Sequence, residues 1–464
     1  MFNSQKHDQI FDAELISRYD LAGPRYTSYP TAVQFHDGFG EADYRRQVEA
    51  TNARGGPLSI YVHIPFCNTV CYFCACNKII TANRKRAVPY LTDLYREIEL
   101  QGELFDRSRP VDQLHWGGGT PTYIDRDQRA GLWGKLAEHF NLHSDDSGEY
   151  SIEIDPREID PKGIAELRGL GFNRISFGVQ DIDPAVQKAV NRLQSWELTQ
   201  EIFHAARDVG FHSISLDLIY GLPHQSRDSF AATLAEVIKL GPDRLSVFNY
   251  AHMPQLFKVQ KQINDADLPS AAEKLAILKS STEQLLEAGY RYIGMDHFAK
   301  PDDELSLAQD NGTLYRNFQG YSTHSECDLV ALGNTGIGMV GRSYSQNEKG
   351  LPDYHERIAN GEIPVFRGVE LTDDDLLRRD IITRLICDFG LDFAGIEARH
   401  NIQFGDYFAA ELQVLQTMQQ DGLLEFDAKS IRVHPGGRLL IRNICMVFDR
   451  YLPKATQQRF SKVI

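Results

Sequence analysis

From about residue 58, short apolar segments rich in β-branched residues alternate with stretches of helical periodicity. That alternation is typical of repeated βα units, which build a parallel sheet because each helix returns the chain to the same end of the sheet. Six units can be counted, two fewer than a closed (β/α)8 barrel has. We therefore predict an α/β fold, a partial (β/α)6 barrel of the TIM type. The expected strands are 58–64, 113–116, 151–155, 174–177, 213–219 and 245–249, and the expected helices are about 88–106, 124–140, 160–170, 183–209, 227–239 and 270–288.

Polar or glycine-rich segments follow every expected strand. Barrel chemistry is carried by the loops at the carboxyl ends of the strands, so these segments should gather at one rim. They are Pro65-Phe66-Cys67, Gly117-Gly118-Gly119-Thr120-Pro121, Asp155-Pro156-Arg157, Gly178-Val179-Gln180, the stretch from Asp217 to Pro223, and Tyr250-Ala251-His252.

Two flanking regions complete the expected organisation. Residues 1–57 contain Gly23-Pro24-Arg25-Tyr26-Thr27-Ser28-Tyr29-Pro30, which is too rich in turn formers for a helix and predicts an ordered arm or lid. Residues 58–370 would form the barrel and an extension. After about residue 370, Leu371-Thr372-Asp373-Asp374 predicts a helix start and amphipathic stretches follow, so 371–464 should be a mainly helical C-terminal domain.

Charge and composition narrow the classes of partner. The chain carries 49 Lys and Arg against 64 Asp and Glu, a net charge of −15, which removes the broad attraction that nucleic-acid binders use. Residues 1–20 lack the apolar stretch of a signal peptide, and no apolar run is long enough to span a membrane. With 7 cysteines, an odd number, a disulfide scaffold is disfavoured and a reducing cytoplasm is expected.

The strongest chemical signal is a cysteine cluster directly after the first expected strand. Cys67, Cys71 and Cys74 are spaced by four and three residues. A structural zinc site generally needs four ligands from two separated pairs, and the sequence has no second such pair. Three cysteines on one loop suit an iron–sulfur cube with one iron left open for a substrate. Cys76 could be a fourth ligand, a reactive thiol or a small core residue, whereas Cys327, Cys387 and Cys445 are expected in the core.

These motifs together resemble the radical S-adenosylmethionine (SAM) superfamily, in which a CxxxCxΦC loop follows the first strand and a GGGTP segment the second. The superfamily fold is a partial barrel of six βα units. More narrowly, the chain is similar over nearly its whole length to the oxygen-independent coproporphyrinogen III oxidase family. The motifs that carry this likeness are the arm 24–30, the stretch 61–78, and the segments 115–121, 217–223, 243–252, 294–298, 317–321 and 442–445.

The resemblance implies a set of cofactor contacts. Cys67, Cys71 and Cys74 would hold one [4Fe–4S] cluster, whose open iron binds SAM. Two SAM molecules are implied: Tyr61, Gly118, Glu153 and Ile337 would lie near the first, and Phe73, Gly119, Thr120, Gln180, Arg192, Asp217 and Ala251 near the second.

Ordinary structural roles are available for several of these residues. Glycines at 117–119 would let backbone amides approach an amino-acid head group, or would simply make a tight turn. Glu153 and Asp217 could accept hydrogen bonds from SAM or cap helices, and Phe73 could pack on an adenosyl group or in the core. The literal GxGxxG at 336–341 is not expected to bind a dinucleotide, because no helix or βα unit is predicted after it.

The implied reaction is the oxidative decarboxylation of two propionates of coproporphyrinogen III to vinyls, which gives protoporphyrinogen IX in anaerobic haem synthesis. A deoxyadenosyl radical made from SAM would remove hydrogen from the propionate β-carbon, and carbon dioxide would leave. A flavodoxin- or ferredoxin-like electron donor and an electron acceptor are required, and we expect a monomer. The alternatives are a radical-SAM-like haem chaperone and a radical SAM methyltransferase that opens haem.

The four propionates of this substrate call for Arg or Lys donors above an apolar floor. Arg25 in the arm, Arg316 and Arg442 are candidates, although a surface arginine is more often only solvated.

Overall fold

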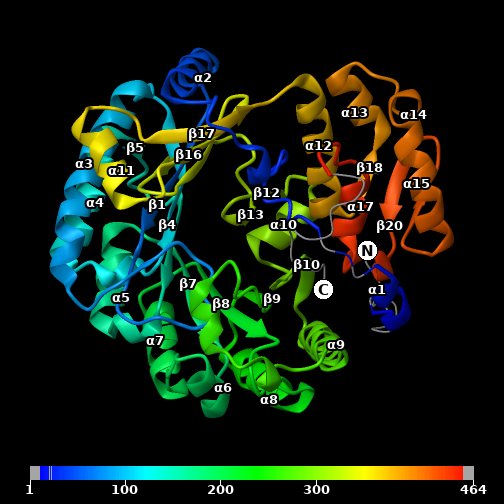
Figure 1. The fold of residues 1–464 in the computed structure, drawn as a ribbon, viewed down its shortest axis with the longest axis horizontal. Helices are drawn as coiled ribbons and strands as arrows, with labels where there is room; N and C mark the ends of the chain where they lie inside the picture. The colour runs from blue at the N-terminus through cyan, green and yellow to red at the C-terminus, as the bar shows by residue number, and fades with distance from the viewer. Residues whose placement is uncertain (1–10, 20, 22, 453–464) are drawn as a thin grey trace. The chain divides into compact units, whose positions relative to one another are not determined.

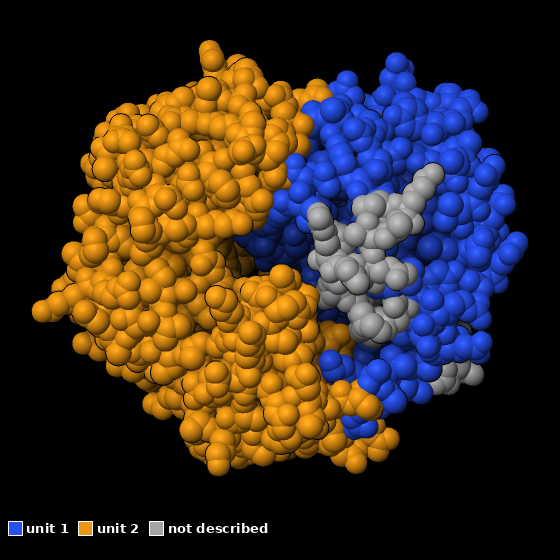
Figure 2. All heavy atoms as spheres, viewed as in Figure 1, with its two compact units in different colours: residues 1–34, 271–325, 371–464 blue, residues 35–270, 326–370 orange. Residues whose placement is uncertain are grey.

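The computed structural model describes residues 11–19, 21 and 23–452 (Figure 1). The chain divides into two compact units, coloured separately in Figure 2. Unit 1 comprises residues 1–34, 271–325 and 371–464, and unit 2 comprises residues 35–270 and 326–370. The ends of the expected arm and C-terminal domain, residues 1–10, 20, 22 and 453–464, lie outside the described residues. The boundaries expected at residues 57 and 370 stay predictions.

Unit 2 is built on parallel strands, as the βα alternation predicts. Six of them pair in parallel in the order β9-β8-β7-β6-β4-β1. Every expected strand is present, so the prediction of a partial barrel is confirmed. The strands are β1 (Leu58–Ile64), β4 (Pro110–Gly118), β6 (Glu149–Ile154), β7 (Arg174–Gln180), β8 (Ser213–Tyr220) and β9 (Arg244–Asn249), with short strands β2 (Phe66–Cys67), β3 (Ile79–Ile80) and β5 (Asn141–Leu142).

Helices follow these strands along the outer side of the sheet (Figure 1). Parallel strands covered by helices are buried on both faces, and Ile152, Phe177 and Leu216 accordingly have no exposed surface. Side chains of Asp125, Ser195 and other small polar residues cap the helix starts. The helices are α3 (Ala87–Leu104), α4 (Arg126–His139), α5 (Pro161–Leu170), α6 (Pro184–Ala189), α7 (Trp196–Asp208) and α8 (Arg227–Leu240).

The prediction of a single helix over 183–209 is wrong. The structure has two helices, α6 and α7, joined by residues 190–195. Asn191 has a left-handed backbone with φ of 54°, which ends the α-helical hydrogen bonding, and Ser195 starts α7 as its N-cap.

The sheet of unit 2 continues past β1 into an extension. β14 (Asp328–Leu332) pairs in parallel with β1, and β15 (Ile337–Val340), β16 (Ser343–Asn347) and β17 (Val365–Glu370) add antiparallel strands. Helix α11 (Leu351–Ala359) connects β16 to β17. The glycines of the GxGxxG segment therefore lie on a strand and in a turn to another strand, which is not the strand-to-helix turn of a dinucleotide site.

The N-terminal residues are partly helical. Residues 23–30 form no helix, as expected, and α1 (Ala13–Tyr19) precedes them in unit 1. Helix α2 (Glu41–Arg54), which belongs to unit 2, was not expected from the sequence. It begins at Gly40, whose amide donates to Asp43 Oδ2 over 3.1 Å.

Unit 1 is mainly helical. A three-stranded sheet in the order β18-β20-β19 and two short hairpins, β10–β11 and β12–β13, accompany the helices. None of its described helices, nor any in unit 2, is long and apolar enough to cross a membrane. Its elements after α1 are α9 (Ala271–Glu287), β10 (Arg291–Gly294), β11 (His297–Ala299), α10 (Glu304–Asp310), β12 (Tyr315–Asn317), β13 (Gly320–Ser322), α12 (Asp373–Asp388), β18 (Gly390–Asp392), α13 (Phe393–His400), α14 (Phe404–Tyr407), α15 (Ala409–Gln420), β19 (Leu424–Phe426), β20 (Ser430–Val433), α16 (Pro435–Arg438) and α17 (Ile441–Val447).

Candidate functional site

A cavity of about 330 Å³ lies in unit 2, at the carboxyl ends of the parallel strands. Most of the residues singled out from the sequence line it. These are the three cysteines and Phe73 of the loop after β1, and Gly118, Gly119, Thr120, Glu153, Gln180, Arg192 and Asp217 from the ends of later strands and their loops. The volume is in the range of small-molecule sites.

Hydrogen-bond donors point at the cysteine sulfurs. Thr120 Oγ1 lies 3.5 Å from Cys67 Sγ. Arg192 Nη1 lies 3.5 Å and Arg157 Nη2 3.7 Å from Cys71 Sγ. Cationic and hydroxyl donors beside thiols favour the anionic thiolate, the form that binds metal. The donors at Cys67 and Cys71 therefore suit thiolate ligands of an iron–sulfur cluster, although burial raises the pKa of the metal-free Cys67 thiol to about 11.

Asp155 fixes the two arginines. It accepts from Arg157 Nη2 over 2.7 Å and from Arg192 Nη1 over 3.0 Å. Burial alone would raise the pKa of Asp155, but the adjacent guanidinium groups hold it below its usual value. The group therefore keeps its charge and leaves one net positive charge directed at Cys71.

Cys76 lies beside Cys74. A hydrogen bond from Cys76 lowers the pKa of the Cys74 thiol to about 6, and the charge of Lys78 adds to this effect. Lys78 Nζ is held by the carbonyl oxygens of Cys74, at 3.1 Å, and Cys76, at 3.3 Å. The surroundings of Cys74 therefore favour its thiolate.

The glycine loop packs against the end of β1. Gly119 N donates to Ile64 O over 2.8 Å, and a Cβ on Gly119 would lie only 2.8 Å from the carbonyl oxygen of Phe66. Gly118 has φ of 119°, which side-chain-bearing residues rarely adopt. These glycines are required by the close approach of two backbone segments, and the amides of both already have protein acceptors.

Glu153 is the centre of a polar network. Its Oε1 lies 3.2 Å from His115 Nε2, and its Oε2 accepts from Gly118 N over 3.3 Å. Burial alone would raise the pKa of Glu153, but these hydrogen bonds hold it below its usual value. Tyr61 stacks on the His115 ring, with centroids 5.8 Å apart, and its hydroxyl lies 3.0 Å from His63 Nδ1.

Asp217 has the opposite electrostatic environment. Burial, reinforced by the charge of Glu153, raises its pKa to about 6, although Ser176 Oγ donates to its Oδ2 over 3.2 Å. Nearby Gln180 has a left-handed backbone with φ of 68° at the irregular end of β7. Strained backbone of this kind persists where the surroundings enforce it and is common at functional sites.

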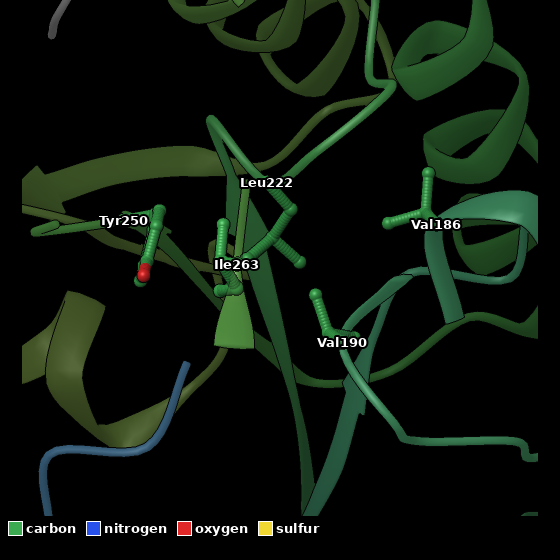
Figure 3. Close-up of a cluster of buried hydrophobic side chains, with 5 residues drawn as sticks. All are labelled: Val186, Val190, Leu222, Tyr250 and Ile263. Carbon is green, nitrogen blue, oxygen red and sulfur yellow. The ribbon is translucent and has the colours of Figure 1, made fainter. Parts of the chain in front are cut away.

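An apolar cluster supports Phe73 from behind. Val186, Val190, Leu222, Tyr250 and Ile263 pack together as Figure 3 shows. Phe73 and Tyr72 of the cysteine loop pack against this cluster, and Gln260 Nε2 donates both to Phe73 O over 3.0 Å and to Ala251 O over 3.2 Å. The ring of Phe73 is therefore held at the edge of the cavity.

Three expected residues do not line the cavity. Tyr61 stacks on His115, which contacts Glu153, and Ala251 is joined to Phe73 through Gln260. Ile337 begins β15, where it is paired with Gln346.

Asp155, Arg157 and His115 were not selected as site residues from the sequence. Asp155 and Arg157 belong to a polar segment that follows an expected strand and was predicted to reach the rim, but the contact of Arg157 with Cys71 depends on the tertiary fold.

Comparisons with known proteins identify the family of this chain. The family model described as the Radical SAM superfamily matches residues 61–237, and the model described as the HemN C-terminal domain matches residues 371–440. The chain is 56% identical over 454 residues to the oxygen-independent coproporphyrinogen III oxidase of Pseudomonas aeruginosa, covering 98% of this chain and 99% of that protein. It is 50% identical over 455 residues to the Escherichia coli protein of the same name, with 98% of each chain covered.

A solved structure extends the likeness to the fold. It is described as coproporphyrinogen III oxidase (HemN) from Escherichia coli, a radical SAM enzyme, and superposes with a TM-score of 0.91 at 49% sequence identity. The superposition covers 96% of this chain and 100% of that one.

Proposed function

The chain belongs to the oxygen-independent coproporphyrinogen III oxidase family of radical SAM enzymes, and we infer that it converts coproporphyrinogen III to protoporphyrinogen IX in haem synthesis. Two propionates are oxidatively decarboxylated to vinyls without oxygen. One observation carries the inference for this chain itself. Three cysteines of one loop, a glycine-rich strand end and two carboxylates line a single cavity.

The family membership implies a [4Fe–4S] cluster and SAM. We propose that Cys67, Cys71 and Cys74 hold the cluster and leave one iron open for SAM. When bound, this pair supplies the deoxyadenosyl radical that removes hydrogen from the substrate. Arg157 and Arg192 stabilise the thiolate of Cys71 through charge-assisted hydrogen bonds, which the donor distances of 3.7 and 3.5 Å support.

In this proposal the other expected site residues contact two SAM molecules. Glu153, kept anionic by His115 and Gly118, accepts from an ammonium or hydroxyl group of the first, with Tyr61 and Ile337 behind it. Asp217, Gln180, Arg192, Thr120, Gly119, Phe73 and Ala251 surround the second. The raised pKa of Asp217 lets this carboxyl donate as well as accept a hydrogen bond near pH 6.

The proposal includes the partners that the reaction requires. A flavodoxin- or ferredoxin-like protein supplies the reducing electron, and a separate acceptor removes one electron for each propionate converted. We place the protein in the cytoplasm, as a monomer. Deletion of residues 1–30 tests the lid role expected of the N-terminal arm, because loss of a lid would uncouple SAM cleavage from product formation.

The direct test is an anaerobic assay of reconstituted protein with reductant, SAM and coproporphyrinogen III. We expect protoporphyrinogen IX, formed through a monovinyl intermediate, together with two deoxyadenosines per product. Cys71→Ala should make neither product. Deoxyadenosine without decarboxylated porphyrin would overturn the proposed substrate.

The same assay separates the alternative functions. A haem chaperone would bind haem tightly and stoichiometrically and release no carbon dioxide. A methyltransferase that opens haem would add a methyl group to its product, whereas decarboxylation removes two carbon dioxide units. Mass spectrometry of the porphyrin products distinguishes these outcomes.

A further inference from the structure

Three arginines from distant parts of the sequence gather around one carboxylate within unit 1. Arg25 lies in the segment after α1, Arg316 is the middle residue of β12, and Arg442 lies on α17. Asp296 occupies the turn between β10 and β11. Arg25 Nη1 forms an ion pair with Asp296 Oδ2. The sequence offered these same three arginines as candidates for binding propionate, with no indication that they would meet.

The charges of these groups influence one another, in line with the ion pair between Arg25 and Asp296. Burial alone would raise the pKa of Asp296, but the charges of Arg25, His297 and Arg316 hold it below its usual value. Burial, reinforced by the charges of Arg25 and Arg316, lowers the pKa of Arg442 to about 10. Three guanidinium groups and one carboxylate leave a positive excess in a largely buried place.

Arg442 has a structural task in this cluster. Its Nε donates to Pro24 O over 2.9 Å, and its Nη2 donates to Gly23 O. These bonds fix the backbone directly before Arg25. Arg442 therefore positions Arg25 beside Asp296, and its Nε and Nη2 donors are occupied by the backbone carbonyls.

Arg316 differs from the other two. Its residue is only 7% exposed, and its Nε and Nη1 atoms have no hydrogen-bond acceptor among the described residues. The guanidinium carbon lies 4.7 Å from the centroid of the Tyr321 ring, and Tyr321 is anchored by its hydroxyl to Ile386 O over 3.0 Å. A stacked ring holds the guanidinium in place without occupying its in-plane donors.

A buried cation with unused donors is costly unless a ligand completes its hydrogen bonds. The arginine fork matches a carboxylate, which accepts two parallel bonds. The amide Nε2 of Gln319, in the turn between β12 and β13, is also buried and without an acceptor among the described residues. Two sets of unused donors on one hairpin suit an anionic oxygen ligand.

We propose that Arg316, oriented by Tyr321 and surrounded by the excess charge of Arg25 and Arg442, binds a carboxylate of the substrate. This assignment rests on the proposed function, because a substrate with four propionates supplies the carboxylate. Arg25 is already paired with Asp296. Arg316 is therefore the group whose charge the ligand neutralises.

The test compares Arg316→Gln with Arg432→Gln. Arg432 provides the control because its side chain is 74% exposed and pairs with Glu425 on the neighbouring strand. Binding of coproporphyrin III to the reconstituted, SAM-loaded protein is followed anaerobically by fluorescence quenching. Arg316→Gln should weaken binding at least about tenfold, since a charge-assisted pair is lost, and should raise KM more than it lowers kcat. Arg432→Gln should bind as the unaltered protein does.

Thermal stability separates a binding role from a structural one. The melting temperature of ligand-free Arg316→Met should equal or exceed that of the unaltered protein, because the variant no longer buries unused donors. A lower melting temperature together with unchanged coproporphyrin binding in Arg316→Gln would overturn the proposal. Free propionate at the concentration that coproporphyrin III requires should not bind. Equal binding of propionate would show that the site takes any small anion and is not specific for the substrate.

The same measurements distinguish failure of the inference from failure of the proposed function. Coproporphyrin binding that depends on Arg316, without any decarboxylated product, would support the carboxylate site and overturn the reaction. Normal product formation with an unchanged KM in Arg316→Gln would overturn the carboxylate site and leave the reaction standing. Substrate-free cleavage of SAM should be the same in all these variants, because the cysteine loop belongs to unit 2.

Discussion

Arg157 lies beside Cys71, with its Nη2 3.7 Å from the thiol sulfur and its orientation fixed by Asp155. Hydrogen bonds to the sulfur ligands of an iron–sulfur cluster stabilise its reduced, more negative form. We expect Arg157→Gln to lower the reduction potential of the cluster, as measured by a redox titration followed by electron paramagnetic resonance. Arg126→Gln, an exposed substitution at the start of α4, is the control and should leave the potential unchanged. An unaltered potential in Arg157→Gln would show that this arginine does not tune the cluster.

Gly119 should tolerate no side chain. An added Cβ would meet backbone atoms of Pro65 and Phe66 at 2.8 Å, and backbone cannot move aside as a flexible side chain can. Gly119→Ala should therefore weaken SAM binding at least about tenfold, measured by equilibrium dialysis. Gly134→Ala, inside α4 with nothing within 4 Å of the new Cβ, is the matched control. The control should bind SAM normally and gain up to about 1 kcal/mol of stability.

Cys76 should differ from its neighbours in iron binding. We expect Cys71→Ser to lose the cluster and Cys76→Ser to retain it, measured as iron and sulfide content after anaerobic reconstitution. The physical reason is that Cys67, Cys71 and Cys74 already supply three ligands, and Cys76 lowers the pKa of the Cys74 thiol rather than replacing it. Loss of iron from Cys76→Ser to the level of Cys71→Ser would instead make Cys76 a ligand.

Glu97 should make the stability of the protein depend on pH. This fully buried carboxyl of α3 accepts from Gly333 N over 2.7 Å, Asn347 Nδ2 over 2.8 Å and the Tyr354 hydroxyl, and burial raises its pKa to about 7. A raised carboxyl pKa means that the folded chain holds its proton above the pH at which the unfolded chain releases it. The free energy of unfolding contributed by Glu97 should therefore fall as pH rises from about 4.5 to about 7.

The measurement is urea unfolding of the unaltered protein and Glu97→Gln between pH 5 and pH 8. The stability advantage of the unaltered protein over the variant should shrink across this range. Glu99→Gln, on the same helix, provides the control. Hydrogen bonds from Lys135 and Arg96 lower the pKa of Glu99, so Glu99 titrates below the measured pH range. The difference in the free energy of unfolding between the unaltered protein and Glu99→Gln should therefore stay constant. A constant difference for Glu97→Gln as well would contradict the prediction.

Leucines at buried and exposed positions should differ in their contribution to stability. Leu216 in β8 has no exposed surface, whereas Leu256 is 63% exposed. Leu216→Ala should lower the free energy of unfolding by about 2–5 kcal/mol because it leaves a cavity in a packed sheet. Leu256→Ala should change it by less than about 0.5 kcal/mol, a contrast that denaturant unfolding resolves.

The parts of the fold that local sequence determines could be predicted. Each parallel strand is an apolar run followed by polar or glycine residues, so its position and the rim to which it points follow from the sequence alone. The cysteine loop is equally local, because its three thiols lie within eight residues of one another. The break between α6 and α7 was missed; it lies at Asn191, whose left-handed backbone accompanies a contact with Val70 of the cysteine loop.

The contacts between distant segments could not be predicted. Nothing in the sequence indicates that Arg157 and Arg192 share Asp155, or that Gln260 joins Ala251 to Phe73. The glycines at 118 and 119 were expected to offer amides to a ligand, but their amides are already bonded to Glu153 and Ile64. Their requirement for glycine comes from the packing of two loops, which a single sequence does not reveal.

The six residues 190–195, which join α6 to α7, restrict how the length of the chain can change at this point. Val190 O accepts from Tyr72 N over 2.9 Å, Asn191 Nδ2 donates to Val70 O over 2.8 Å, and Arg192 reaches the sulfur of Cys71. Three consecutive residues thus each contact the cysteine loop. An insertion or deletion of one residue here would shift all three contacts together, so sequence drift in this linker can proceed by substitution far more readily than by a change in its length.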